Sequence, residues 1–367
     1  MSHVALVKTA AGARAFGAAG ARPYRRDSNW VPPLPGEERV TFDGRKNPAL
    51  DGVEFRRWIL LDRAEPVGRI AAFAPAHRPG IGYVGFFESP DDPGAASALL
   101  AAAEEWLGAR GRRECYGPIA VTPRDRIGLL TEGFDRPPVL FTPYNPPYYR
   151  ALLEAAGWSA YQMLSAYAWD AAYADGRGVR SLGQRAEDGS SIRIRPLRLD
   201  ALRHETRLIA QLINEALADA WHFDPVSDRE ADDMARLLRP VIDPAIALVA
   251  EDGSGPCGVA LAMPDVNWLW RRAGGRLFPF GWAQLLRWRR HIPCARMMVL
   301  GLSGRVHRTG LAARLIRGLL EAGVSRGYVS GEMSQVYDDN RTMRRMLDRM
   351  GFPVVRRYAV FTRRLEA

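Results

Sequence analysis

The segment MMVLGLSGRVHRTGLAARLI, residues 297–316, joins an apolar run to a turn containing Thr309 and Gly310 and then to a helical pattern. We interpret the apolar run as a strand that ends before the turn. The first N–H groups of a helix lack partners within the helix, and this arrangement suits a phosphate group. The segment therefore predicts a strand, a loop and a helix, in which the loop is either a phosphate site or an ordinary turn.

The length and composition of the chain are typical of a globular protein with two domains. It has 367 residues, of which 47% are hydrophobic and 25% charged. The three cysteines are far apart and the six histidines show no ligand spacing, so no disulfide framework or metal site is predicted. No apolar run reaches the roughly 18 residues of a membrane span, and the N-terminus lacks a signal core. We expect a cytoplasmic protein, with peripheral attachment to the inner membrane face as an alternative.

The net charge of +10 is concentrated in residues 266–320, which contain eleven Arg and no Asp or Glu. Such a local excess indicates a site for an anionic partner. Residues 266–295 form an insert in which Trp268–His291 interleaves Trp, Phe and Arg. This pattern fits an anionic membrane surface or a tunnel for an acyl chain, ordinary packing, or, least favoured, single-stranded nucleic acid.

Both halves of the chain follow one order of predicted elements. In the second half, a strand and a helical region (201–238) precede a hairpin (245–263), and alternating strands and helices end in the strand YAVFTRRL. In the first half, RRWILLDRAEPVGRIAAF is the hairpin, and NPPYYRALLEAAGW parallels the later NRTMRRMLDRMGF. The match indicates an internal repeat. We expect domains at residues 1–174 and 192–367, joined by a polar linker at 175–191.

Two motifs of the second half resemble those of the GNAT family of acyl-CoA N-acyltransferases. Residues 307–312 correspond to the family's loop Q/R-x-x-G-x-G/A, with His307 at its first position. Residues 340–352 correspond to N-x-x-A-x-x-L-Y-x-K-x-G-F, with Leu347 where the family often has its general-acid Tyr. The resemblance implies an α/β (α+β) fold of two tandem GNAT-like domains, each with a mixed, mostly antiparallel sheet flanked by helices.

Several further stretches, among them SNWVPPL, GFFESPDDP and YNPPYYRALLEAAGW, resemble a family of bacterial tandem-GNAT N-acyltransferases associated with the bacterial ceramide synthases. This likeness covers nearly the whole chain. It implies transfer of a long-chain acyl group from acyl-CoA, as a co-substrate, to a primary amine of a lipid, a sphingoid base. No permanently bound cofactor is implied.

The resemblance also implies roles for residues of the second half. The backbone of Thr309, Gly310, Leu311 and Ala312, with Arg308, would hold the diphosphate of CoA, aided by Arg305. The strand at Leu300, Gly301 and Leu302 would lie beside the thioester, and a bulge there would free an N–H group for its carbonyl oxygen. Asn340 would contact the pantetheine arm, although a helix N-cap explains it as well. In the first half, Asp91 and Asp92 would repel a diphosphate, so that half is expected to have lost the cofactor.

Transfer to an amine requires a group that takes the amine's proton, because an alkylamine is mostly protonated at pH 7. Glu332, in a largely apolar strand, is the first candidate, and the alternative is an edge residue that faces solvent. His307 is the second candidate, with a structural role as its alternative. Tyr337 or Tyr358 could donate a proton in place of the missing Tyr. Two rival functions stay open: a catalytically silent protein that binds anionic membrane or nucleic acid, and a tRNA-dependent aminoacyltransferase.

Overall fold

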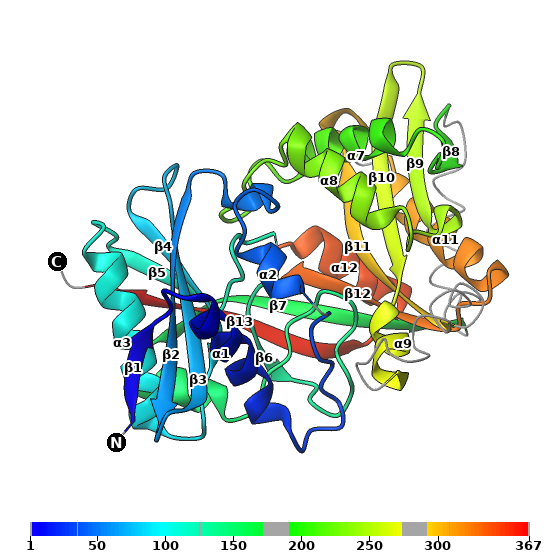
Figure 1. Cartoon of the computed structure of the whole chain (residues 1–367). Helices are drawn as coiled ribbons and strands as arrows, with labels where there is room; N and C mark the ends of the chain where they lie inside the picture. Colours follow the sequence, from blue (N-terminus) through cyan, green and yellow to red (C-terminus); the bar gives the residue numbers. More distant parts are fainter. Residues whose placement is uncertain are drawn as a thin grey trace. The chain divides into compact units, whose positions relative to one another are not determined.

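The structure is a computed structural model that describes residues 2–34, 36–124, 126–171, 191–273, 292–307 and 309–365. Contacts divide the chain into two compact units (Figure 1): unit 1 is Met1–Leu164 with Arg356–Ala367, and unit 2 is Ser165–Val355. These units do not test the expected repeat boundaries at 174 and 192, which stay predictions. The expected linker lies outside the described residues except for Ser191.

Unit 1 is built on a sheet that is antiparallel except between its fourth and fifth strands. The strands are, in order, β1 (His3–Leu6), β2 (Val53–Asp62), β3 (Glu65–Pro75), β4 (Ile81–Glu88), β5 (Glu114–Gly117) and the unit 1 part of β13 (Val354–Arg364), which also pairs with β6 (Leu129–Glu132). The helices are α1 (Ala10–Ala21), α2 (Glu37–Thr41), α3 (Pro93–Gly108) and α4 (Tyr149–Ala155), with 3-10 turns η1 (Arg22–Tyr24) and η2 (Pro48–Leu50).

Unit 2 repeats this plan. Its strand order is β8 (Arg193–Pro196), β9 (Ala247–Asp252), β10 (Gly255–Pro264), β11 (Cys294–Leu302), β12 (Ser330–Tyr337) and the unit 2 part of β7 (Ser159–Asp170). Its helices are α7 (Leu202–Ala216), α8 (Asp228–Leu238), α9 (Val266–Arg272), α11 (Leu311–Ser325) and α12 (Arg341–Met350), with 3-10 turns η3 (Pro244–Ile246) and η5 (Gly304–Val306). The predicted hairpins and the mixed α/β class are confirmed.

The helical region expected at 201–238 consists of two helices. Helix α7 ends at Ala216 and α8 begins after Ser227. Pro225 lies in the break, where it has no N–H group to donate to a helix. Ser227 and Glu230 then form a reciprocal capping box, in which each side chain accepts the other's backbone N–H.

Each unit buries one helix face against its sheet. In unit 1, Leu99, Leu100 and Leu107 of α3 are fully buried against β3. In unit 2, Leu315 and Ile316 of α11 take the same place. Burial of one such side chain stabilises a fold by about 1.5–3 kcal/mol, so these helices fix the sheets on which they lie. None of the helices in the described parts of the chain has the length and apolarity to cross a membrane.

Two strands pass from one unit to the other along the chain. Strand β7 starts in unit 1 and ends in unit 2, and β13 starts in unit 2 and ends in unit 1. Phe361–Arg364 of β13 pair with β5 of unit 1, although the sequence places this strand in the second repeat. The alternation of apolar residues predicts β13 correctly, but it carries no information about the strand's partner.

Candidate functional site

Strands β11 and β12 of unit 2 run parallel and paired at first and then continue without pairing to each other. Their register joins Cys294 to Ser330 through Met297 to Met333. Beyond these last partners, β11 still pairs with β10 on its other side. We call this point, where the described ladder between β11 and β12 ends, the strand fork.

A bulge lies at the strand fork. Leu261 of β10 pairs with Val299, but the next residue, Ala262, pairs with Met297, so Met298 is an extra residue in β11. The strand therefore has a bulge, but it lies three residues before Gly301, where it was expected; Gly301 itself pairs regularly with Val259. Because successive N–H groups along a strand point to opposite sides, some amides between Met298 and Leu302 point away from β10, toward the side where pairing with β12 has ended.

The loop after β11 leads to the uncapped start of α11. Gly310 precedes the helix with a φ of +77°, a left-handed conformation that favours glycine. The first helical hydrogen bond joins the Arg314 N–H to the Gly310 oxygen at 3.2 Å. The N–H groups of Leu311, Ala312 and Ala313 therefore have no helical partner.

Among the described residues, few acceptors lie near these backbone N–H groups. The Thr309 hydroxyl lies 3.4 Å from the Leu311 N–H, but its shorter contact, 2.7 Å, is the bond that it donates to the Val306 oxygen. Thr309 and Gly310 are exposed, and no acidic residue occupies the first turn of α11. The helix start thus places backbone donors next to an exposed loop, with the favourable end of the helix dipole behind them, although Leu311 and Ala313 are themselves buried.

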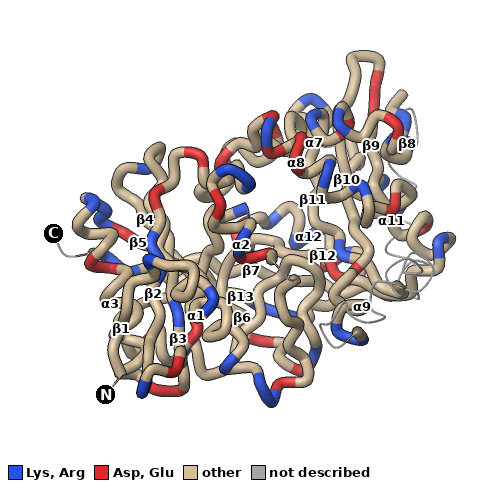
Figure 2. The backbone as a smooth tube through the Cα atoms, viewed as in Figure 1, with Lys and Arg blue, Asp and Glu red and all other residues tan. Residues whose placement is uncertain are grey.

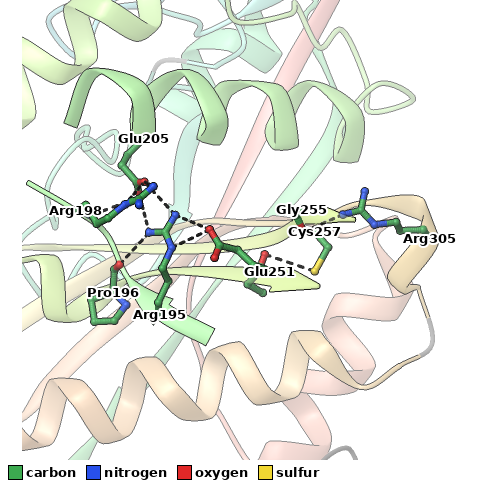
Figure 3. A network of polar contacts seen from close by, with 9 residues as sticks. Arg195, Pro196, Arg198, Glu205, Glu251, Gly255, Cys257 and Arg305 are labelled. Carbon is green, nitrogen blue, oxygen red and sulfur yellow. Dashed lines mark hydrogen bonds and ion pairs between the residues drawn. The ribbon is translucent and has the colours of Figure 1, made fainter. Parts of the chain in front are cut away.

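The structure describes only one of the two arginines that were expected to bind phosphate beside this loop. Arg305 binds the β9–β10 hairpin instead. It donates to the carbonyl oxygen of Gly255 at 3.1 Å (Figure 3). It also donates to the Pro256 oxygen at 2.8 Å and pairs with Asp252. Arg308 lies outside the described residues. Figure 3 also shows Glu205 of α7 held by Arg195 and Arg198, a network that ties the helix to the edge strand. These arginine contacts hold the pKa of the Glu205 carboxyl below its usual range, despite the opposing effect of burial.

A group of buried polar residues lies on one face of the sheet at the strand fork. Met297 and Met333 point to the core under α11, so their neighbours Arg296 and Glu332 point to the opposite face. This is the face that α7 covers, since a Cβ on Gly301 would lie 3.5 Å from Ala216. Arg296 and Glu332 are direct register partners and are 6% and 4% exposed.

Ser334 completes this group. Arg296 donates from Nε to the Ser334 hydroxyl oxygen and from Nη2 to the Ser334 carbonyl oxygen, each at 3.0 Å. Since Ser334 is the first residue of β12 beyond the last pair with β11, Arg296 anchors β12 where the two strands part. The solvent-facing alternative for Glu332 is wrong, because β12 lies between β11 and β7 and the side chain is buried. Arg296 and Ser334 were missed; the signal was a charged residue before the apolar run MMVL, facing Glu332 in a parallel pair.

The other predicted residues of unit 2 are more dispersed. His307 is exposed in the loop. Tyr337 ends β12, and burial, with the nearby Asp339 carboxylate, raises the pKa of its hydroxyl, so the phenol stays protonated. The Asn340 side chain accepts the Met343 N–H at 3.1 Å, so its expected N-cap role is confirmed. Leu347 is fully buried in the core.

In unit 1 the place corresponding to the α11 start is filled. Asp92 caps α3 by accepting the N–H groups of Gly94 at 2.8 Å and Ala95 at 3.2 Å. The first helical residue, Pro93, has no N–H. The carboxylate of the chain itself therefore occupies the position that a bound phosphate would take.

The corresponding fork in unit 1 is closed as well. The β4–β5 ladder ends at Tyr83 and Tyr116, but the Ile119 N–H then donates to the Val84 oxygen at 2.8 Å. Gly85 permits this approach, because a Cβ there would lie 2.0 Å from the Ile119 oxygen. The bulge is retained at Phe86, with a φ of +52°, and its ring packs 4.8 Å from that of Phe42.

Unit 1 also contains a buried carboxyl with an unusual pKa. Glu88 accepts the hydroxyl protons of Tyr24 at 2.8 Å and Tyr149 at 2.7 Å, and lies 3.6 Å from Arg69. Burial raises the pKa of Glu88 to about 7, against the opposing effects of Arg69 and the two hydroxyls.

The insert expected at 266–295 is described only at its two ends. Helix α9 carries its first residues, in which Leu269 and Trp270 are buried and Arg272 lies 3.9 Å above the Trp268 ring. Residues 274–291 lie outside the described residues, so most of the predicted membrane or acyl-tunnel segment stays a prediction. Within the described residues, no group of three or more His, Cys, Asp or Glu could hold a metal ion.

Comparisons with known proteins identify relatives of similar length. No protein-family model matches it. It is 30% identical over 375 residues to the bacterial ceramide synthase of Caulobacter vibrioides, covering 98% of this chain and 96% of that one. It is also 30% identical over 365 residues to protein YghO of Escherichia coli K12, covering 96% and 93%.

Solved structures share the fold at low sequence identity. A tandem GNAT protein from the clavulanic acid biosynthesis pathway has a TM-score of 0.63 at 12% identity, over 100% of this chain and 99% of that chain. A GCN5-related N-acetyltransferase from Sphaerobacter thermophilus has a TM-score of 0.56 at 14% identity, over 100% and 96%.

The fold is thus that of the tandem GNAT proteins. Within this class, the chain belongs to the family that includes the bacterial ceramide synthase and YghO, and it is an acyl-CoA-dependent N-acyltransferase.

Proposed function

We propose that this protein transfers a long-chain acyl group from acyl-CoA to the amino group of a sphingoid base at the strand fork of unit 2. The observation that carries the proposal is the contrast between the two units. The α11 start offers unfilled amides beside a fork, whereas the α3 start is capped by Asp92 and its fork is closed by Ile119. Unit 1 is accordingly a degenerate repeat that has lost the cofactor.

In this proposal, the diphosphate of CoA binds the backbone of residues 309–312, with the side chain of Arg308 adding charge. Gly310 lets the phosphates approach the main chain closely, since it has no side chain. Asn340 can contact the pantetheine arm through its amide nitrogen, because its oxygen is already occupied as an N-cap. The arm then runs along Leu300, Gly301 and Leu302.

The bulge at Met298 supplies the hydrogen-bond donor that polarises the thioester carbonyl. An N–H group freed there donates to the thioester oxygen and stabilises the oxyanion that forms when the amine nitrogen attacks the carbonyl carbon. The C–S bond then breaks and CoA leaves as a thiolate. A thiol has a pKa of about 8.5, so it needs little help to leave, and Tyr337 is the proposed proton donor where help is needed.

Glu332 is the proposed base that takes the proton from the attacking amine. It lies on the face of the sheet opposite α11, at the fork, in a buried position from which water is largely excluded. His307 is the second candidate, but its exposure in the loop favours it less. The sphingoid base as acceptor rests on the name of the Caulobacter relative, and peripheral attachment to the membrane through residues 268–291 rests on sequence alone.

The test is direct turnover. Purified protein is incubated with palmitoyl-CoA and sphinganine, and free thiol and the N-acyl product are measured. Glu332→Gln should lower kcat by at least about a hundredfold, a typical contribution of a general base, with acyl-CoA affinity unchanged. Glu321→Gln, at an exposed position on α11, is the matched control and should leave kcat unaltered. Absence of turnover across a panel of lipid amines, or aminoacyl transfer from tRNA in its place, would contradict the proposal.

A further inference from the structure

Helix α12 presents a row of arginines to solvent. Arg341, Arg345 and Arg349 follow one another at four-residue intervals, so they form one stripe about 12 Å long. We call these three residues the arginine stripe. All three are exposed, and none has a carboxylate within 4 Å among the residues that the structure describes.

The stripe is held rigidly. On the opposite side of α12, Leu347 and Met350 are buried in the unit 2 core, and Met343 and Met346 pack against it. Beside the stripe, a shallow hollow of about 260 Å³ is lined by Arg341, Arg344, Arg345 and Asp348. The helix that carries the charges is therefore anchored in the core of unit 2.

This helix differs from its neighbours in unit 2. On α7 and α8, Arg203 and Arg207 both pair with Asp232, and charges of both signs are interspersed (Figure 2). Like charges four residues apart destabilise a helix slightly when nothing opposes them. A stripe of unpaired arginines therefore costs stability unless it has a partner of opposite charge.

The chemistry of the exposed face favours a protein partner over a membrane. A helix that lies in a membrane surface exposes Leu, Phe or Trp beside its basic residues. The exposed residues of α12 are Arg, Thr342 and Asp348, with no large apolar side chain among them. An acidic helix, with carboxylates at the same four-residue spacing, complements the stripe better.

The place of the stripe in the chain suggests which protein this is. Helix α12 begins at Arg341, directly after Asn340 and four residues after the end of β12, where the acyl donor is proposed to bind. We propose that the arginine stripe docks an acidic acyl carrier protein, whose phosphopantetheine thioester serves as a second acyl donor at the strand fork. This inference rests on the proposed function, since it uses the same site.

The reaction is the same with either donor. The amine nitrogen attacks the thioester carbon, its proton passes to the base, the C–S bond breaks, and the thiolate leaves on the phosphopantetheine of the carrier in place of CoA. The stripe contributes no atom to the chemistry. It raises the rate of productive encounter and the affinity of the carrier, and both effects weaken with salt.

The test compares the two donors in one variant. Arg345→Glu/Arg349→Glu is assayed with palmitoyl-carrier protein and with palmitoyl-CoA. The matched control is Arg193→Glu/Arg239→Glu, which makes the same change in charge at exposed positions on β8 and after α8. We expect kcat/KM for the carrier to fall at least tenfold in the α12 variant only, with palmitoyl-CoA turnover within twofold of wild type.

Three results would overturn this inference. Equal losses with both donors would mean that the stripe holds phosphates of CoA. No carrier turnover by the wild type, with vesicles of anionic lipid bound through the same arginines, would assign the stripe to a membrane. If the wild type uses palmitoyl-CoA but not the palmitoyl-carrier protein, and the α12 variant keeps the palmitoyl-CoA activity, the carrier has no role. A wild type inactive with both donors would instead remove the proposed function itself.

Discussion

Replacement of Gly310 by Glu tests whether the start of α11 binds the diphosphate of acyl-CoA. The variant places a carboxylate beside the N–H groups of Leu311, Ala312 and Ala313, which have no partner within the helix. It thereby gives α11 what Asp92 gives α3 in unit 1, an anion that belongs to the chain itself.

Two effects of this substitution can be estimated from the structure. A side chain at a φ of +77° costs about 1–2 kcal/mol of folding stability. A carboxylate about 5 Å from one phosphate charge adds roughly 1–3 kcal/mol of repulsion at effective dielectric constants between water and a protein surface. Since 1.4 kcal/mol corresponds to a factor of ten, the Kd for acyl-CoA should rise by roughly tenfold to a hundredfold.

The assay is titration calorimetry with palmitoyl-CoA at low and high salt, with Tm measured in parallel. Gly327→Glu is the matched control, because Gly327 follows the other end of α11, is exposed, and has a φ of +89°. It should lose similar stability and keep its affinity for acyl-CoA. Gly310→Ala carries the backbone cost without the charge, so its loss of affinity should be smaller and less dependent on salt.

One result would refute the assignment of the loop. If Gly310→Glu is folded and binds acyl-CoA as tightly as the wild type, the amides of α11 do not hold the diphosphate. Equal weakening by Gly327→Glu would point the same way, because it would trace the effect to helix stability and not to the anion.

Two further predictions concern the helix caps and the pH dependence of stability. Asp92→Ala and Asn340→Ala each remove an N-cap and should each lower the free energy of unfolding by about 1 kcal/mol, but only Asn340→Ala should weaken acyl-CoA binding. Equal effects of both on binding would contradict the assignment of the donor site to unit 2. The folded-state pKa of Glu88 is about 7, above its unfolded value, so folding takes up a proton between these values and stability falls as pH rises through 7. Between pH 5 and pH 8 the wild type should lose about 2 kcal/mol relative to Glu88→Gln in denaturant titrations, and parallel curves for the two proteins would disprove the raised pKa.

Much of unit 2 follows from short stretches of sequence. The apolar run before Ser303 predicts β11, and the absence of a side chain at Gly310 predicts the uncapped helix start, because both depend on local chemistry. Asn340 likewise shows its N-cap role in its position before α12. Such features need no knowledge of residues far away in the chain.

The missed features all depend on distant pairing. Arg296 and Glu332 are 36 positions apart, and only the parallel register makes them partners. The closure of unit 1's fork by Ile119 depends on a segment that has no pattern of its own. Strand β7 was not predicted, although SAYQMLSAYAWD alternates partly and its counterpart in the second repeat, YAVFTRRL, was predicted.

The passage of β7 and β13 between the units has a consequence for biosynthesis. Strand β5 receives its neighbour Phe361–Arg364 only after the second repeat has been synthesised. The first repeat therefore cannot complete its sheet while the second repeat is still being made, and the edge of β5 stays open until then. A gene cut between the repeats would give two fragments that each need the other's strand, so the duplication can no longer be undone by separating its copies.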